Sequence, residues 1–462
     1  MKKVSKAITI YVEGNSCNLQ CEYCYQKNSN PTEKSIVVNL LYPIDEMIRA
    51  FSPKRLGGLA EITVIGCAET LLTQQIIPFV HGLLEYGHVV TVVTNATLSE
   101  RIDRLLDCSE ECLQNLILKC SFHYRELIKK ELLNTYFNNI KKALNAGASA
   151  YPFVVICQDY VNEFETISKI MMDNLGIQAH CSPCTEVKNS FDLRFGANFN
   201  PMPNESLMEQ LDKYFDTRIY KECIKYKSVD VQSTFCYAGS WSICIDFMTG
   251  KMCKCHGCPV ESGNFYQNID EPFIWKEPIA MSCAIESCAL QYNFFSEGLM
   301  PDKPCKYTYG KLIYIPSLIS EYLRDKLDVS FSDIYRRLSK EDETIVALKN
   351  KNIQIRRLQN EILENPFVNP KIREMSQIGK KIAILGTGRI YEKYKSYINF
   401  PVDCYLDSYL DGTKHVFNDK EMKKPIELIE NADDYFIVVA VKDKESIFES
   451  LIELGFNSNN FC

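Results

Sequence analysis

Short runs of β-branched and apolar residues alternate with helical patterns over roughly the first 200 residues, and this alternation constrains the fold more than any other feature. Strand-helix alternation requires parallel pairing with right-handed crossovers, which gives an open sheet or a barrel, full or partial. The expected strands are residues 8–12, 61–65, 89–93, 116–120, 152–156 and 177–180. The expected helices are residues 44–51, 72–86, 99–106, 135–145 and 163–175.

Three cysteines, Cys17, Cys21 and Cys24, follow the first expected strand. Three thiolates at this spacing can hold three irons of a 4Fe-4S cluster and leave the fourth iron without a protein ligand, whereas an electron-transfer cluster normally takes four cysteines. The alternatives are a zinc loop or a few buried thiols. Zinc requires a fourth Cys or His nearby, and His81 is the first histidine in the chain, so an iron-sulfur cluster is favoured.

The C-x3-C-x2-C spacing, with an aromatic residue before the last cysteine, resembles the signature of the radical S-adenosylmethionine (radical SAM) enzymes. The resemblance implies that the open iron binds the amino and carboxylate groups of SAM. It also implies that an electron from the cluster cleaves SAM to a 5′-deoxyadenosyl radical, which abstracts a substrate hydrogen. The implied fold for residues 1–230 is a partial (β/α)6 barrel, with reacting groups at the carboxyl ends of the strands.

The residues after the next strands extend this resemblance. Gly66-Cys-Ala-Glu69-Thr-Leu is similar to the G-G-E-P element that accepts the SAM ammonium, and the alternative for Glu69 is a carboxylate at a helix N-terminus. Thr94-Asn95-Ala-Thr resembles the T-N-G-T turn beside the SAM methionine. Ser121 occupies the position of a polar residue near the SAM carboxylate or ribose. The resemblance thus implies that SAM is bound by Gly66, Glu69, Thr94, Asn95 and Ser121.

Two further residue groups follow strands of the same region. His123 is predicted to be structural or substrate-facing, because it has no partner ligands in the sequence for a metal. Cys181-Ser-Pro-Cys184 is expected to face the cavity as a ligand pair, a redox pair or simple lining. We assign no catalytic acid or base from the sequence.

A second cysteine cluster begins at Cys236 and defines a predicted cysteine-rich domain over residues 231–310. It resembles the SPASM or twitch extension, which implies at least one auxiliary 4Fe-4S cluster, and residues 242–247 followed by Thr249-Gly250 predict a hairpin. The reserve ligands, for a different assignment or a second cluster, are Cys244, Cys253, Cys258 and Cys283. The alternative is a zinc ribbon of Cys253, Cys255, Cys258 and Cys283. The predicted auxiliary ligands are Cys236, Cys255, Cys288 and Cys305.

Residues 311–378 turn charged and predict a helical linker. Ser339-Lys-Glu-Asp342 resembles a capping box, and Asn365-Pro366 predicts the end of a long helix. A short, imperfect heptad pattern lies between them, for which a packed linker helix is favoured over a coiled coil.

Residues 379–462 predict a small Rossmann-like α/β module. A strand at 381–385 enters the turn Gly386-Thr-Gly388, and Asp407 ends a second strand about twenty residues on, where a dinucleotide fold places its ribose-binding acid. A third strand, 435–440, and a helix, 446–454, complete the unit. Tyr391 stands at the third glycine position, so NAD binding by Gly386, Gly388 and Asp407 is possible but not expected.

Composition bounds the remaining possibilities. With 462 residues, 46% hydrophobic residues and a net charge of -7, the chain is typical of a globular protein and atypical of a nucleic-acid or anionic-membrane binder. No apolar run reaches the roughly 18 residues of a membrane span. Twenty-one cysteines without a signal peptide indicate reduced thiols and metal clusters, so we expect a cytoplasmic protein.

The combined hypothesis is a radical SAM enzyme of the SPASM/twitch branch that modifies a peptide or protein side chain, supplied with electrons by a donor such as flavodoxin or ferredoxin. A sugar or nucleotide-sugar substrate is the alternative, motivated by the C-terminal module. A non-enzymatic iron-sulfur electron carrier is a third hypothesis. It predicts four cysteines at the first cluster and no use for Glu69 or Asn95.

Overall fold

The computed structural model describes residues 2–14, 16–24, 30–32, 34–186, 198–199, 201–231, 233–255, 258–283, 288, 294, 296–335, 337–410, 415–441 and 443–462. The chain divides into two compact units, Met1–Lys351 and Asn352–Cys462. The four predicted domains with boundaries at 230, 310 and 378 stay a proposal.

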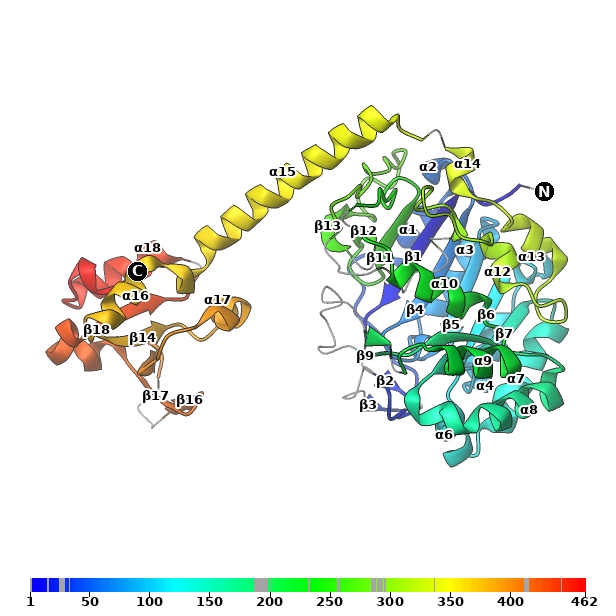
Figure 1. Cartoon of the computed structure of the whole chain (residues 1–462), viewed down its shortest axis with the longest axis horizontal. Helices are drawn as coiled ribbons and strands as arrows, with labels where there is room; N and C mark the ends of the chain where they lie inside the picture. The colour runs from blue at the N-terminus through cyan, green and yellow to red at the C-terminus, as the bar shows by residue number, and fades with distance from the viewer. Residues whose placement is uncertain are drawn as a thin grey trace. The chain divides into compact units, whose positions relative to one another are not determined.

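The first unit is a mixed α/β structure built on one large sheet (Figure 1). Six strands lie in chain order and pair in parallel, as predicted: β1 (Lys6–Val12), β4 (Ala60–Gly66), β5 (Val89–Thr94), β6 (Leu116–Phe122), β7 (Ser149–Ile156) and β8 (His180–Pro183). The last strand was expected at residues 177–180. It lies at His180–Pro183 and shares only His180 with the prediction, because the preceding helix ends at Leu175 with Gly176 in a left-handed conformation and the chain must first return to the sheet.

Helices connect these strands, and the five predicted ones are confirmed to within a few residues. The expected helix at 72–86 begins at Ile76, because Thr70–Leu72 forms a separate 3-10 turn, η1, that Glu69 caps. The helices of this region are α1 (Ile44–Arg49), α2 (Pro53–Leu56), α3 (Ile76–Glu85), α4 (Ser99–Leu106), α5 (Glu110–Leu113), α6 (Tyr124–Lys129), α7 (Leu133–Asn145), α8 (Phe164–Leu175), α9 (Glu205–Tyr214) and α10 (Arg218–Lys227), with the 3-10 turn η2 (Gln158–Glu163).

Three cysteine-bearing strands extend the sheet beyond β1. β11 (Ser242–Asp246) pairs in parallel with β1, and β12 (Lys251–Cys255) and β13 (Cys258–Asn264) follow in antiparallel pairing. The predicted hairpin is thus confirmed. Gly250 turns it at φ 71°, where an added Cβ would lie 2.5 Å from the Asn264 side chain. The predicted auxiliary-cluster segment therefore continues the same sheet as the six parallel strands.

Smaller elements complete this unit. The short strands are β2 (Ser16–Cys17), β3 (Asn30–Pro31), β9 (Thr185–Glu186) and β10 (Asn198–Phe199), and the short helices are α12 (Tyr309–Ile313), α13 (Glu321–Lys326) and α14 (Phe331–Ile334). Leu312, Leu323 and Phe331 of these helices are buried in the core of the first unit. No described helix combines the length and apolar composition that a bilayer crossing requires.

His88 sits fully buried before β5 and has both ring nitrogens engaged. Nδ1 accepts from the Ala60 backbone N–H at 3.0 Å, and Nε2 donates to the Phe51 carbonyl at 2.7 Å. Burial lowers the pKa of His88 to about 4. The folded protein therefore holds this imidazole neutral at pH values where the unfolded chain, titrating near its ordinary value of about 6.5, takes up a proton.

We expect acid to destabilise the first unit through His88. As pH falls from about 6.5 to about 4, the free energy of unfolding should drop by up to about 3 kcal/mol from this group. Urea unfolding at several pH values measures this loss. His88→Gln should weaken the protein at neutral pH and reduce the acid slope by up to one proton. An unchanged slope would contradict the assignment.

The second unit begins within α15 (Lys340–Glu364), whose start and end match the prediction. Ser339 Oγ accepts from the Asp342 backbone N–H at 3.1 Å, and the helix stops before Asn365 and Pro366. Phe367 and Ile372 are buried with Ile382 and Tyr391 in one core, so the packed unit includes residues N-terminal to 379.

The second sheet has the order β16-β17-β15-β14-β18. The three predicted strands are confirmed as β14 (Lys381–Leu385), β15 (Cys404–Leu406) and β18 (Tyr435–Val439), all parallel. The hairpin β16 (His415–Phe417) and β17 (Lys420–Lys423) was not predicted. The remaining elements are α16 (Pro370–Gln377), α17 (Arg389–Tyr394), α18 (Lys444–Glu453), η4 (Pro366–Val368), η5 (Lys395–Tyr397), η6 (Pro425–Asp434) and η7 (Ser458–Asn460).

Candidate functional site

The three N-terminal cysteines lie together on a loop at the carboxyl end of β1. All three are half-buried, and the Cys24 backbone N–H donates to the Cys21 carbonyl at 3.0 Å, which closes a turn between them. Burial raises the pKa of Cys17 to about 11, and burial followed by the charges of Cys24 and Cys17 raises the pKa of Cys21 further. The thiolates would thus repel one another, and bound cations would relieve that repulsion.

Among the residues that the structure describes, no three His, Cys, Asp or Glu side chains are arranged to hold a single metal ion. Cysteines of an iron-sulfur cluster bind separate irons, so they need not converge on one point. The ligand assignments stay a proposal.

Glu69 joins the ends of β4 and β5. Its side chain is 6% exposed. Oε1 accepts from Thr94 Oγ1 at 2.6 Å and from the Leu71 backbone N–H at 3.0 Å, and Oε2 accepts from the Asn95 backbone N–H at 2.8 Å. Burial raises the pKa of Glu69, while these hydrogen bonds oppose that rise. The carboxylate is therefore committed to holding the two strand ends in place.

A side-chain network continues from β5 to the cysteine loop. Asn95 Nδ2 donates to Asn18 Oδ1 at 2.7 Å, and Asn18 Nδ2 donates to Thr97 Oγ1 at 2.7 Å. The Thr97 hydroxyl donates to Asn95 Oδ1 at 2.6 Å, and Asn95 Nδ2 also lies 3.9 Å from Cys17 Sγ. The backbone N–H of Glu69 reaches the Ser16 carbonyl at 3.2 Å. These contacts bring Cys17, Glu69, Thr94 and Asn95 to one place.

Gly66 ends β4 in a close turn. An added Cβ would lie 3.1 Å from the Thr70 backbone, and the Gly66 N–H donates to Thr70 Oγ1 at 2.8 Å. Thr70 stands where the resembled motif has proline, and its hydroxyl satisfies a strand-end donor. The turn therefore closes through a side-chain hydrogen bond.

Ser121 lies half-buried near the end of β6, and His123 follows that strand. His123 Nδ1 lies 2.6 Å from the Tyr23 hydroxyl, and burial lowers the pKa of His123 to about 4. Tyr23 therefore shares a hydrogen bond with a neutral imidazole. Glu126 Oε2 also accepts from the Gln20 backbone N–H at 3.1 Å. His123 and Glu126 fasten the cysteine loop to β6 and α6, a role that sequence reasoning did not specify.

Cys181 and Cys184 do not form a pair. Cys181 is buried with its Sγ 3.8 Å from the Asp216 carbonyl, so it faces the helical segment after β8. Side chains alternate along a strand, and a three-residue separation places the two thiols on opposite faces. The neighbour of Cys184 is Cys157, at the end of β7, and interaction with the Cys184 thiol, followed by burial, raises the pKa of Cys157.

Some of the predicted auxiliary-cluster cysteines lie near one another. Cys236, Cys255 and Cys288 are buried, and burial followed by the charges of Cys255, Cys236 and Cys283 raises the pKa of Cys288. Cys305 lies beside Glu222 of α10; burial and that charge raise the pKa of Cys305 to about 12. Sequence reasoning did not select Cys223 on α10, whose charge also acts on Cys288. Its sequence position, thirteen residues before Cys236, carried no spacing signal.

The glycine turn of the second unit follows β14. Gly386 has φ 95°, and an added Cβ would lie 2.7 Å from Val441, so this position requires glycine. Asp407 Oδ1 accepts from the Tyr409 backbone N–H at 2.8 Å. Tyr391 is buried against Phe367 and Tyr405, with its hydroxyl 3.1 Å from that of Tyr405. Gly388 has open space around it.

We expect no NAD binding by the full chain in calorimetry at micromolar concentrations. Tyr391 fills the space where a third glycine would bring helix and sheet together, and Asp407 is engaged in its own turn. Micromolar binding that is lost in Asp407→Ala would contradict this expectation and favour the sugar-substrate alternative.

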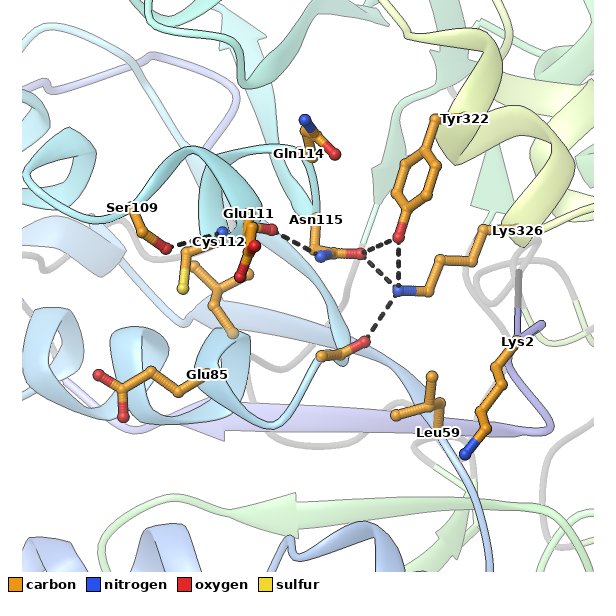
Figure 2. A pocket seen from close by; sticks show the side chains of 12 residues that line it. Lys2, Leu59, Glu85, Ser109, Glu111, Cys112, Gln114, Asn115, Tyr322 and Lys326 are labelled. Carbon is orange, nitrogen blue, oxygen red and sulfur yellow. Dashed lines mark hydrogen bonds between the residues drawn. The ribbon is translucent and has the colours of Figure 1, made fainter.

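A separate pocket of about 550 Å³ lies at the end of the large sheet opposite to the cysteine loop (Figure 2). Leu59, Gly87 and Asn115 line it, and they precede β4, β5 and β6, so the pocket is at the amino ends of the strands. The buried Lys326 Nζ donates to the Gly87 carbonyl at 2.9 Å and to Asn115 Oδ1 at 2.5 Å, and lies 3.3 Å from the Tyr322 hydroxyl. Its hydrogen bonds are thus satisfied within the protein, and it is not poised to bind an anion.

No protein-family model and no curated protein matches the sequence. Solved structures that resemble the chain include Streptococcus suis SuiB bound to S-adenosylmethionine, at 15% identity over 58% of this chain and 65% of that chain, with TM-score 0.39. Another is anSMEcpe with bound AdoMet and Cp18Cys peptide, at 11% identity over 77% of this chain and 99% of that chain, with TM-score 0.36. A third is BtrN in complex with AdoMet and 2-DOIA, at 14% identity over 58% of this chain and 82% of that chain, with TM-score 0.31. The match spans less than two thirds of the length of SuiB.

Proposed function

We propose that the Met1–Lys351 unit is a radical SAM enzyme. The observation that supports it is the hydrogen-bond network that brings Cys17, Glu69, Thr94 and Asn95 together at the carboxyl ends of β1, β4 and β5. These residues come from separate sequence motifs, and more than fifty positions separate Cys17 from Glu69. Each motif resembles a piece of one SAM site. The electron-carrier alternative does not explain why Glu69 is buried at this place.

In this proposal Cys17, Cys21 and Cys24 hold three irons, and the Gly66 turn, the Thr94-Asn95 turn and Ser121 line the SAM. When bound, a 4Fe-4S cluster with SAM on its open iron supplies a 5′-deoxyadenosyl radical. Glu69 acts as a positioning residue, since its carboxylate already accepts three hydrogen bonds from the protein. The SAM ammonium would then be received by backbone carbonyls of the turn.

The second cysteine group would hold at least one auxiliary 4Fe-4S cluster of the SPASM/twitch type, with Cys236, Cys255, Cys288 and Cys305 as ligands. Support comes from the proximity of three buried thiols, since the charges of Cys255 and Cys236 raise the pKa of Cys288. Cys283, whose charge also acts on Cys288, is one of the four reserve ligands. A cytoplasmic location and an electron donor such as flavodoxin or ferredoxin complete the proposal.

The substrate class we favour is a peptide or protein side chain, because the first and second cysteine segments together resemble peptide-modifying maturases. The sugar or nucleotide-sugar alternative rests on the second unit, whose β14-Gly386 turn and parallel strand order β15-β14-β18 resemble those of a Rossmann-like module. Neighbouring genes separate the two: a short precursor-peptide gene favours the first, and glycosyltransferase genes favour the second.

The direct test is anaerobic reconstitution with iron and sulfide, followed by reaction with SAM and dithionite. We expect 5′-deoxyadenosine in amounts that depend on enzyme concentration, measured by liquid chromatography and mass spectrometry. Fully reconstituted protein that leaves SAM intact would contradict the proposal.

A further inference from the structure

The ends of β7 and β8 carry two cysteines that the proposed SAM chemistry does not use. The strands pair in parallel with Val155 opposite Ser182 and Ile156 opposite Pro183. The next residues are Cys157 and Cys184, and the Cys184 backbone N–H donates to the Ile156 carbonyl at 2.9 Å, so the pairing continues to them. Cys157 also keeps an extended backbone, with φ -105° and ψ 154°.

This pairing places the two thiols on one face. Adjacent strands lie about 4.8 Å apart, which falls within the range of about 4.4–6.8 Å between the Cα atoms of a disulfide. Cys157 and Cys184 are 3% and 8% exposed, and interaction with the Cys184 thiol is the largest cause that raises the pKa of Cys157. No backbone movement is therefore required to join them.

The shared face is the inner face of the sheet. Alternation along β7 places Cys157 on the side of Phe153 and Tyr151. The Phe153 ring lies 3.8 Å from Lys119 Nζ of β6, and the Tyr151 ring packs at 5.5 Å on His180 of β8. The thiol pair also borders the cysteine loop, because Tyr160 of η2, which follows Cys157, packs at 5.5 Å on Tyr23.

We propose that Cys157 and Cys184 form a redox-active thiol pair on the wall of the candidate site. On oxidation both S–H bonds break and one S–S bond forms, and two electrons and two protons pass to a two-electron oxidant such as a diazene or a small disulfide. A dithiol reductant reverses the step. The pair thus gives the site a thiol-disulfide couple separate from its iron-sulfur ligands.

The test oxidises anaerobic holoprotein with diamide, whose N=N bond takes up the two hydrogens. After acid quenching, N-ethylmaleimide alkylation and trypsin digestion, mass spectrometry should find peptides 143–169 and 170–188 linked and lighter by two hydrogen atoms. Dithiothreitol treatment before quenching should remove the link. Because thiol state is read directly, the result stands whether or not the protein cleaves SAM.

Cys181 provides the matched control, since it lies on the same tryptic peptide and the same strand but on the opposite face. Cys184→Ser should abolish the link, and Cys181→Ser should retain it, with circular dichroism confirming that both variants fold. Absence of the link in folded wild-type protein under excess diamide would overturn the proposal. So would a link that survives Cys184→Ser and is lost in Cys181→Ser.

Discussion

Replacing Cys17, Cys21 and Cys24 together by alanine should abolish 5′-deoxyadenosine formation and leave the auxiliary iron in place. The three thiols are the proposed holders of the only cluster with an open iron, and no other described cysteine lies on their loop. Iron and acid-labile sulfide should fall by the content of one 4Fe-4S cluster. The measurements are product quantification and iron analysis on reconstituted protein.

A matched triple variant separates thiol loss from general damage. Cys108, Cys404 and Cys462 belong to neither proposed cluster, and their replacement by alanine should preserve product formation and iron content. If the Cys17, Cys21 and Cys24 variant still cleaved SAM at the wild-type rate, the cluster assignment would be wrong.

Glu69→Ala should have the second largest effect, on stability as well as on SAM cleavage. The substitution removes the acceptor of three donors, Thr94 Oγ1 and the backbone N–H groups of Leu71 and Asn95. A buried donor left without a partner costs about 1–3 kcal/mol, and water entering the space recovers part of this, so we expect a loss of about 3 kcal/mol. Urea unfolding measures it, and SAM cleavage should fall because Asn95 loses its anchor.

Two controls test the reason for this effect. Glu69→Gln keeps an oxygen acceptor and should be less damaging than alanine. Glu100→Ala removes an exposed carboxylate paired with Arg104 on α4 and should change stability by less than about 1 kcal/mol. Equal stability of Glu69→Ala and wild type would show that the network does not hold the strand ends.

The sequence was sufficient for strands such as β1, β4 and β5 because they are rich in apolar, β-branched residues that are mostly buried. It misplaced β8, whose residues His-Cys-Ser-Pro carry no such pattern. It was also sufficient for α15, where Ser339 and Asn365-Pro366 mark the ends. The β16–β17 hairpin was not predicted because its strands are short and polar. Its turn, Asn418-Asp419 with φ 48° and 60°, carries the residues typical of a two-residue hairpin loop and could have revealed it.

The sequence predicted which residues belong to the candidate site, but it did not predict the hydrogen bonds between them. Glu69, Thr94 and Asn95 were selected as SAM contacts, but the hydrogen bonds that bind them to each other depend on the register of β4 and β5. The Cys181-x2-Cys184 spacing suggested a pair that strand alternation forbids, and Cys157 joins Cys184 only through pairing of β7 with β8. Contacts between distant segments are not encoded in local spacing.

The most direct test of the central claim is electron–nuclear double resonance of the reduced, reconstituted protein with SAM labelled with nitrogen-15 at its amino group. Ligation of SAM to the open iron held by Cys17, Cys21 and Cys24 predicts a nitrogen-15 coupling to the cluster spin, absent when unlabelled SAM is used. A reduced cluster whose spectrum is the same with and without SAM, and which shows no nitrogen-15 coupling, would contradict the account.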